Sequence, residues 1–118
     1  MKNSILVLVV MAVFLWSFRS NEETSYFVQF KVFTVESNEK AQLIDEKMRQ
    51  KSGVKISRTD YYTSTYYCVL NSGVTYSEEQ FKNWFHKLGY EIGCFTMGIH
   101  GKDLITSPHT LKSCKNEK

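Results

Sequence analysis

Residues suited to catalysis and metal binding are scarce in this sequence. Its 118 residues include only three cysteines and three histidines, and no two cysteines stand close enough for a C-x-x-C pair. No Ser/His/Asp or Cys/His set with a recognisable local signature occurs, and no pair of carboxylates stands out. The sequence therefore predicts a protein that is not an enzyme, with no catalytic residue and no cofactor.

Neither sign of charge is in large excess. Lysine and arginine number 15 against 12 aspartates and glutamates, which gives a formal net charge of +3. Such a weak and mixed balance does not favour a polyanion, so we expect no nucleic-acid partner. No internal repeat or low-complexity tract is present, and the length predicts one domain.

Long apolar runs are missing too. The longest covers residues 5–18, between Lys2 and Arg19, and Ser17 is its only polar residue. A basic start before a short apolar run is typical of a signal peptide, and the run is too short to span a membrane comfortably. Because the cleavage site lacks the usual pair of small residues, an uncleaved N-terminal anchor is the alternative. We expect residues 1–24 to be one or the other, and the protein to be exported, either periplasmic or secreted.

Three cysteines cannot all be paired within one chain in such an oxidising compartment. An oxidising environment allows one internal disulfide among Cys68, Cys94 and Cys114 and leaves one thiol over. Cys68 lies in a predicted strand and is expected to be a small buried residue. Cys94 and Cys114 can pair if the C-terminal segment returns to the domain, but the sequence does not require it.

Hydrophobic periodicity predicts the element order β-α-β-β-α-β. Alternating aromatic and β-branched residues indicate the strands, while Ser37 or Asn38 and then Ser77 can cap the helices. This order predicts an α+β, ferredoxin-like fold with a four-stranded antiparallel sheet and two helices on one face. The expected strands are 26–35, 54–62, 66–70 and 91–99; the domain spans 25–101, and a polar tail covers 102–118.

Short motifs in this frame resemble the heavy-metal-associated (HMA) domain family. They are Phe30-Lys31-Val32 with Thr34-Val35-Glu36-Ser37, Gly53-Val54, Ser77-Glu78-Glu79, and Leu88-Gly89-Tyr90-Glu91. The resemblance implies the ferredoxin-like fold and a loop that carries C-x-x-C in the family. Here that degenerate loop reads Ser37-Asn38-Glu39-Lys40, so a neutral hydroxyl and a cation replace the two soft thiolates. Metal binding is therefore not implied for this chain, whereas docking of a partner through the loop is.

A second resemblance gives an alternative function. Tyr26-Phe27-Val28-Gln29-Phe30 is similar to the opening strand of the exported SPOR domains, which share the element order. That resemblance implies a cell-wall-binding domain.

A relocated metal site is the other alternative. Cys94, Met97 and His100 are soft or borderline ligands at a spacing of three. Positions three apart on a regular strand point to opposite faces, so the three can converge only if the strand bends at Gly93 or Gly98. The competing interpretation is that Cys94 and Met97 are packing residues.

The sheet face away from the helices is the candidate partner surface. Phe27, Phe33, Tyr67 and Val69 are expected to point to that side, and exposed aromatic residues often mark an interaction surface. The alternative is that one terminus folds over this face. The best overall interpretation is an exported, non-catalytic, HMA-like module that binds an unknown protein partner. Its core is expected to contain Phe30, Val32, Ile44, Met48, Cys68, Leu70, Phe81, Trp84, Phe85 and Leu88.

Overall fold

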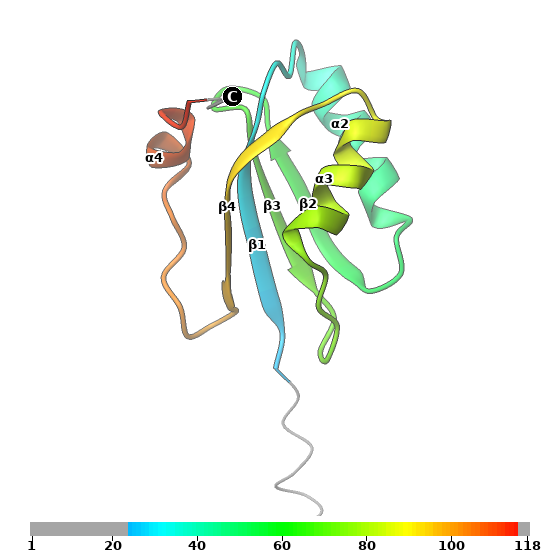
Figure 1. Cartoon of the computed structure of the whole chain (residues 1–118), viewed down its shortest axis with the longest axis vertical. Helices are drawn as coiled ribbons and strands as arrows, with labels where there is room; N and C mark the ends of the chain where they lie inside the picture. Colours follow the sequence, from blue (N-terminus) through cyan, green and yellow to red (C-terminus); the bar gives the residue numbers. More distant parts are fainter. Residues whose placement is uncertain (1–23, 116–118) are drawn as a thin grey trace, which may run out of the picture.

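The structure, a computed structural model, describes residues 24–115 (Figure 1). The predicted leader lies outside this range except for Thr24. The described residues form an α+β domain with a four-stranded antiparallel sheet in the order β2-β3-β1-β4 and three helices, an arrangement compatible with the ferredoxin-like plan. The elements are β1 (Tyr26–Val32), α2 (Asn38–Arg49), β2 (Val54–Asp60), β3 (Thr65–Leu70), α3 (Glu78–Lys87), β4 (Ile92–Ile99) and α4 (Pro108–Lys112).

Local sequence determines where the two longer helices begin and end. The hydroxyls of Ser37 and Ser77 accept hydrogen bonds from the backbone N–H three residues later, at 3.2 Å and 3.1 Å, so both predicted caps are confirmed. After α2, Gly53 adopts a φ of +84°, which glycine tolerates far better than other residues. The first strand ends at Val32 rather than Val35, because Thr34 turns into the left-handed region with a φ of +66°.

The core lies between the sheet and the helices α2 and α3. Its centre is Phe30, whose ring is fully buried. Most of the predicted core residues are buried here, but Trp84 and Leu88 are only half-buried. The buried cluster consists of Val28, Phe30, Val32, Val35, Ala41, Ile44, Met48, Tyr66, Cys68, Leu70, Phe81 and Phe85.

A β-bulge interrupts the pairing of β4 with β1. Gln29 pairs with Thr96 and Lys31 with Gly93, so two residues of β4 lie opposite Phe30 alone. Cys94, the first of these two, has a φ of +54°. At the bulge, Cys94 is bonded to Cys114 of the C-terminal segment, whereas the Phe95 ring packs on Phe30 in the core.

The C-terminal segment covers the sheet face opposite α2 and α3. In Figure 1, α4 and the chain leading to it lie on the far side of the sheet from the other two helices, and α4 contacts β1 and β3. We call residues 100–115 the strap. The expected polar tail is therefore part of the folded domain as far as Lys115, with Leu111 of α4 buried on the side facing the sheet. Within the described residues, no helix is long and apolar enough to cross a membrane.

Candidate functional site

The degenerate loop of residues 37–40 lies between β1 and the first turn of α2. Ser37 uses its hydroxyl to cap the helix by accepting from the Lys40 backbone N–H, and this bond is what brings the two positions together. Asn38, Glu39 and Lys40 are exposed. The loop thus presents a neutral capping hydroxyl and one ammonium group where the family has two thiolates.

The outer sheet face is not the open surface that alternation suggested. Phe27 and Val69 are each 1% exposed, and Phe33 and Tyr67 are half-buried. The rings of Phe27 and Tyr67 lie 6.2 Å apart, centroid to centroid. The structure therefore brings these four candidate partner residues to one face but encloses them. The alternative, in which a terminus folds over the face, describes the structure.

Two glycines of β4 explain part of this enclosure. A Cβ atom at Gly98 would come within 2.7 Å of the Phe27 ring, and one at Gly93 within 2.9 Å of the Phe33 ring. Each aromatic side chain thus lies over a glycine of the neighbouring strand and fills the space that a side chain would take. The pairing accounts for both glycines without any ligand.

Specific polar contacts hold the strap in place. The side-chain amide of Gln29 donates to the Thr106 carbonyl and accepts from the Thr106 N–H, both at 2.9 Å. At the start of the strap, the Asp103 carboxylate accepts from the Ile99 N–H at 2.7 Å. Gln29 is buried, and its side-chain amide forms hydrogen bonds with both backbone groups of Thr106. A buried apolar side chain at this position could not form them.

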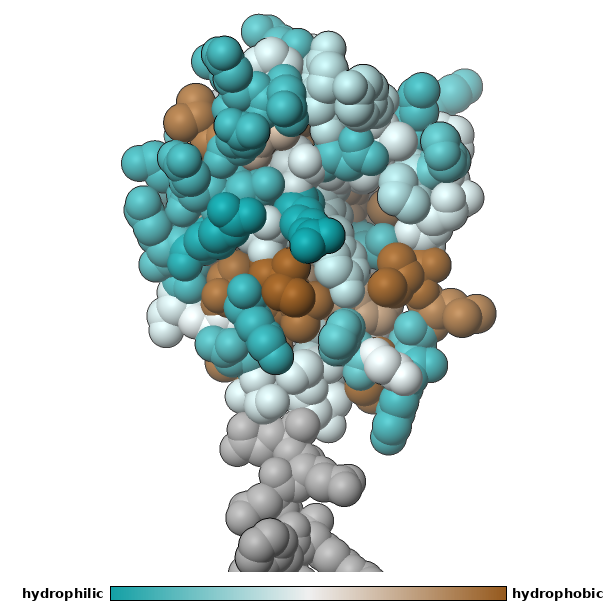
Figure 2. Space-filling view, turned by 180° about the vertical axis from the view of Figure 1, so that it is seen from behind, coloured by the Kyte–Doolittle hydropathy of each residue, from teal (hydrophilic) through white to brown (hydrophobic). Residues whose placement is uncertain are grey.

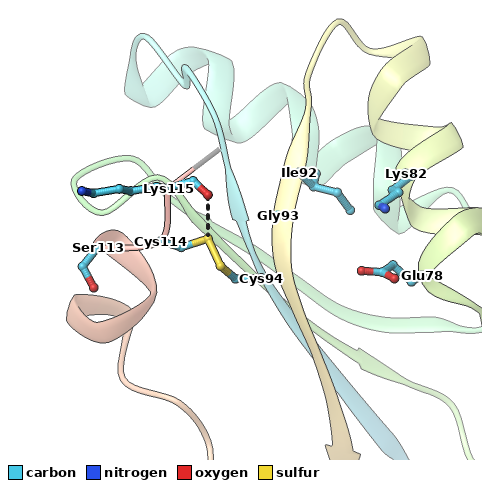
Figure 3. Close-up of a pocket in the computed structure, with 8 residues that line it drawn as sticks. All are labelled: Glu78, Lys82, Ile92, Gly93, Cys94, Ser113, Cys114 and Lys115. Carbon is cyan, nitrogen blue, oxygen red and sulfur yellow. Dashed lines mark hydrogen bonds between the residues drawn. A yellow bond between two sulfur atoms is a disulfide. The ribbon is translucent and has the colours of Figure 1, made fainter. Parts of the chain in front are cut away.

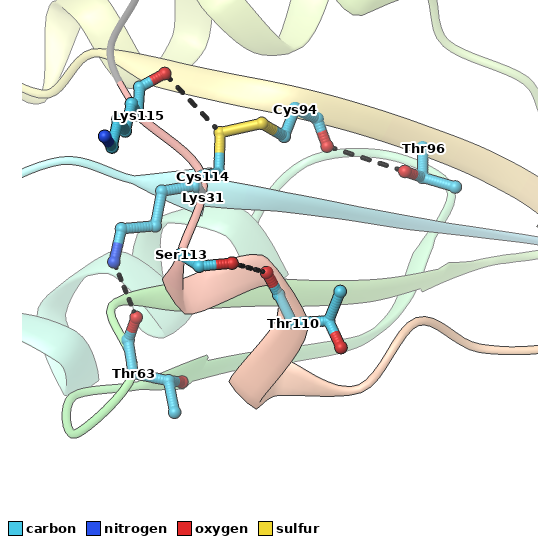
Figure 4. The surroundings of a disulfide bond; sticks show 8 residues. All are labelled: Lys31, Thr63, Cys94, Thr96, Thr110, Ser113, Cys114 and Lys115. Carbon is cyan, nitrogen blue, oxygen red and sulfur yellow. Dashed lines mark hydrogen bonds between the residues drawn. A yellow bond between two sulfur atoms is a disulfide. The ribbon is translucent and has the colours of Figure 1, made fainter.

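A disulfide closes the strap at its far end. Cys94 and Cys114 are bonded, with a separation of 20 residues (Figure 4). Nearby, Lys31 donates to the Thr63 carbonyl at 2.8 Å; burial lowers the pKa of the Lys31 ammonium, and so does the positive charge of Lys112 on α4. Because the ammonium groups of Lys31 and Lys112 repel each other, this pair does not hold the strap. The disulfide and the buried side chain of Leu111 hold this end of it.

The relocated metal site is not assembled. Cys94 points to the strap side, where it is bonded to Cys114. Met97 pairs directly with Val28, a core residue on the helix side, so Cys94 and Met97 diverge across β4. His100 follows the strand, and its N–H donates to the Ser25 carbonyl. Among residues 24–115 no group of three His, Cys, Asp or Glu side chains is placed to hold a metal ion.

The remaining thiol is buried and unreactive in character. Cys68 is fully enclosed in the core, and burial raises its pKa to about 11. A nucleophilic cysteine needs an accessible thiolate, which this environment disfavours. The expected role of Cys68 as a small buried residue is confirmed.

A hollow of about 550 Å³ lies beside the disulfide (Figure 3). Figure 3 shows Glu78 and Lys82 on α3 facing it from one side and the disulfide from the other. The lining carries both signs of charge, and no described group in it is set up as a nucleophile or base. This hollow therefore suggests no particular chemistry.

Apolar side chains still reach the surface elsewhere. Figure 2 shows them in groups among hydrophilic residues on the lower half of the face seen from behind. On the helix side, Leu43 of α2 is 51% exposed although a leucine can bury its whole side chain in a core. Leu43 lies one helical turn before Lys47, which lines a second hollow.

This second hollow separates the two longer helices, and we call it the helix groove. It measures about 370 Å³ and is lined by Lys47, Gln50, Lys51, Trp84, Lys87 and Leu88. The Lys51 ammonium lies 5.4 Å from the centre of the Trp84 ring, a cation–π contact. Lys47 and Lys87 each belong to the last turn of a helix, where positive charge favours the helix dipole. The groove thus combines an apolar floor with a rim of three lysines, and none of the described lining residues is acidic.

A polar network fixes the orientation of α2 and so one wall of the groove. Asp45 accepts hydrogen bonds from the Thr59 hydroxyl at 2.7 Å and the Thr59 N–H at 3.1 Å. Arg49 donates to the Ser57 carbonyl at 3.1 Å, and the Ser57 and Tyr66 hydroxyls are 2.7 Å apart. These bonds join one edge of α2 to β2, which leaves the edge bearing Leu43 and Lys47 on the groove side.

The groove was not predicted from the sequence, because helical periodicity assigns Trp84 and Leu88 to the core. The signal that could have shown it is the spacing of Lys47, in the last turn of α2, and Lys51, just after that helix, together with Lys87 near Trp84 on α3. No protein-family model, curated protein or solved structure gives a significant match to this chain.

Proposed function

We propose that this chain is a non-catalytic, protein-binding module that works outside the cytosol, built on a ferredoxin-like plan and similar in form to HMA domains but without their metal site. The strand order β2-β3-β1-β4, with α2 and α3 on one face, supports the plan. The short motifs around Ser37, Gly53 and Tyr90 support the likeness to the family.

The disulfide supports the location outside the cytosol. Disulfides form and persist in oxidising compartments and are rare in the cytosol of most organisms. The Cys94–Cys114 bridge joins the strap to an interior position of β4, so it belongs to the folded domain itself. The predicted signal peptide or anchor at residues 1–24 points the same way.

The loop chemistry supports a role without metal. The Ser37 hydroxyl is occupied in capping α2, and the Lys40 ammonium would repel a cation at that point. We therefore propose that the domain has the fold of a metal carrier but binds no metal.

The helix groove is the observation that carries the protein-binding role. Half-exposed Trp84 and Leu88 form apolar surface rimmed by polar residues, a pattern typical of protein contact sites, and Leu43 adds an exposed apolar side chain one turn before Lys47 on α2. The outer sheet face is a poorer candidate, because the strap covers it.

Site-specific photo-crosslinking tests this function. We expect a benzoylphenylalanine placed at Leu43 to capture a discrete protein partner in the cells that make the chain. The matched control carries the same group at Lys82, an exposed position of α3 that lines the other hollow and not the groove. Equal yields from the two positions, or no protein adduct from Leu43, would contradict a binding role for this side of the domain.

A further inference from the structure

We infer that the helix groove binds an acidic segment of a partner protein, with an apolar side chain of that segment seated on Trp84 and Leu88 and its carboxylates facing Lys47, Lys51 and Lys87. This inference rests on the proposed protein-binding function and names the chemical class of the partner.

Charge complementarity selects an acidic partner. Three ammonium groups surround one hollow of about 370 Å³, and none of its described lining residues is a carboxylate. A carboxylate that enters the groove would meet positive charge from both helices. An acidic side chain near these lysines is attracted over roughly 8 Å at physiological ionic strength, so charge also guides the approach.

The floor of the groove selects an apolar anchor. Trp84 and Leu88 are half-buried, so a partner side chain that covers them removes apolar surface from water. Leu43, one turn before Lys47 on α2, offers a further exposed apolar side chain outside the hollow. Contacts between helices and grooves commonly use such an anchor within a polar rim.

The anchor site is largely preformed. The Trp84 ring makes T-shaped contacts with Tyr76 and Phe81, with ring centroids 4.8 Å and 5.3 Å away, and the Lys51 ammonium lies over the Trp84 ring. Tyr76 in turn donates to the carbonyl of Ser52, three residues after the end of α2. Because the ring is already held from two sides, binding costs less ordering of side chains.

The dimensions favour a peptide over nucleic acid. Binding to a nucleic acid uses a positive stripe that follows many phosphates. The groove instead offers three lysines around a hollow that holds a few side chains, on a chain with a net charge of only +3. An acidic segment with one apolar residue matches both its charge and its size.

The test is an NMR titration of the purified protein with a 12-residue peptide of alternating glutamate and leucine. We expect saturable shifts centred on the amides of Lys47, Trp84 and Lys87. Replacing Lys47, Lys51 and Lys87 together by glutamine should weaken binding at least about tenfold, since three charge contacts are lost. The matched control replaces Lys55, Lys102 and Lys115, which lowers the net charge equally, and should weaken binding less than about twofold.

Each other outcome overturns the inference. Equal losses in the two triple variants would mean diffuse attraction to net charge. If a peptide with glutamine in place of glutamate bound as tightly as the glutamate peptide, the partner segment would not need to be acidic. Anionic lipid vesicles that bind through the same three lysines, with no peptide binding, would mean a membrane surface instead. In all three cases, partner capture from Leu43 still reports separately on the proposed protein-binding function.

Discussion

Replacing Phe30 with alanine should lower the free energy of unfolding by about 3–5 kcal/mol, because it leaves a large cavity at the centre of the core. The ring is fully buried. It packs against Tyr66 at 4.9 Å, Phe85 at 5.0 Å, Phe81 at 5.7 Å and Phe95 at 6.0 Å, measured between ring centroids. These rings join β1 to β3, α3 and β4, so the loss is felt across the domain. Urea denaturation measures the change.

Two controls make this result specific. Phe30→Leu keeps most of the volume and should cost clearly less than the alanine variant. Leu104→Ala removes a side chain that is 95% exposed and should change stability by no more than about 0.5 kcal/mol. A loss under about 1 kcal/mol for Phe30→Ala would place the core elsewhere.

Removing the disulfide should have the second largest effect. Cys94→Ser with Cys114→Ser should cost about 2–4 kcal/mol, because the unfolded chain regains the freedom of a loop of this length. The bridge spans 20 residues that include most of the strap. We also expect faster hydrogen exchange at the Thr106 amide, which bonds to the buried Gln29 side chain, since the strap opens more often.

Thiol counting is the control for the bridge. Because Cys68 is the one free cysteine and burial raises its pKa to about 11, the native protein should resist alkylation near pH 8. Unfolding without a reductant should expose one thiol, and unfolding with a reductant three. Three thiols without a reductant, or unchanged Thr106 exchange in the double variant, would contradict a strap held by the bridge.

Local chemistry made the elements of the domain predictable. Alternation in β1 placed Val28, Phe30 and Val32 on one face, and the structure buries all three beneath the helices. Serines 37 and 77 mark the helix starts because their hydroxyls satisfy N–H groups that have no partner in the first turn. These signals lie within a few residues of the positions they determine.

The strap could not be predicted in the same way, because long-range contacts define it. Residues 102–118 are mostly polar and contain Pro108, which is typical of a tail. The side-chain amide of Gln29, 77 residues before Thr106, fixes this segment. One sign was present in the predicted strand 26–35. Its outer face carries Phe27 and Phe33 as well as polar residues, and a strand with apolar residues on both faces favours burial on both sides.

The helix groove depends on the exact rotation of α3. A shift of one residue turns a helix by about 100°. The apolar stripe of α3 contains Phe81, Trp84, Phe85 and Leu88, which periodicity assigns to one core-facing set. The structure divides it: Phe81 and Phe85 enter the core, while Trp84 and Leu88 form the groove floor. Only the packing partners decide this division.

Cu(I) titration tests most directly the proposal that this domain keeps the frame of a metal carrier without its metal site. Ser37→Cys with Lys40→Cys should restore two thiolates beside the N-terminus of α2, where the helix dipole favours the charged form. Both the double variant and its parent should carry Cys94→Ser and Cys114→Ser, so that reduced native thiols do not contribute. We predict that the double variant binds one Cu(I) per chain through two sulfur atoms, and that the parent shows no stoichiometric binding. Tight binding by the parent would contradict a metal-free role, and no gain in the double variant would contradict the likeness to the metal-carrier loop.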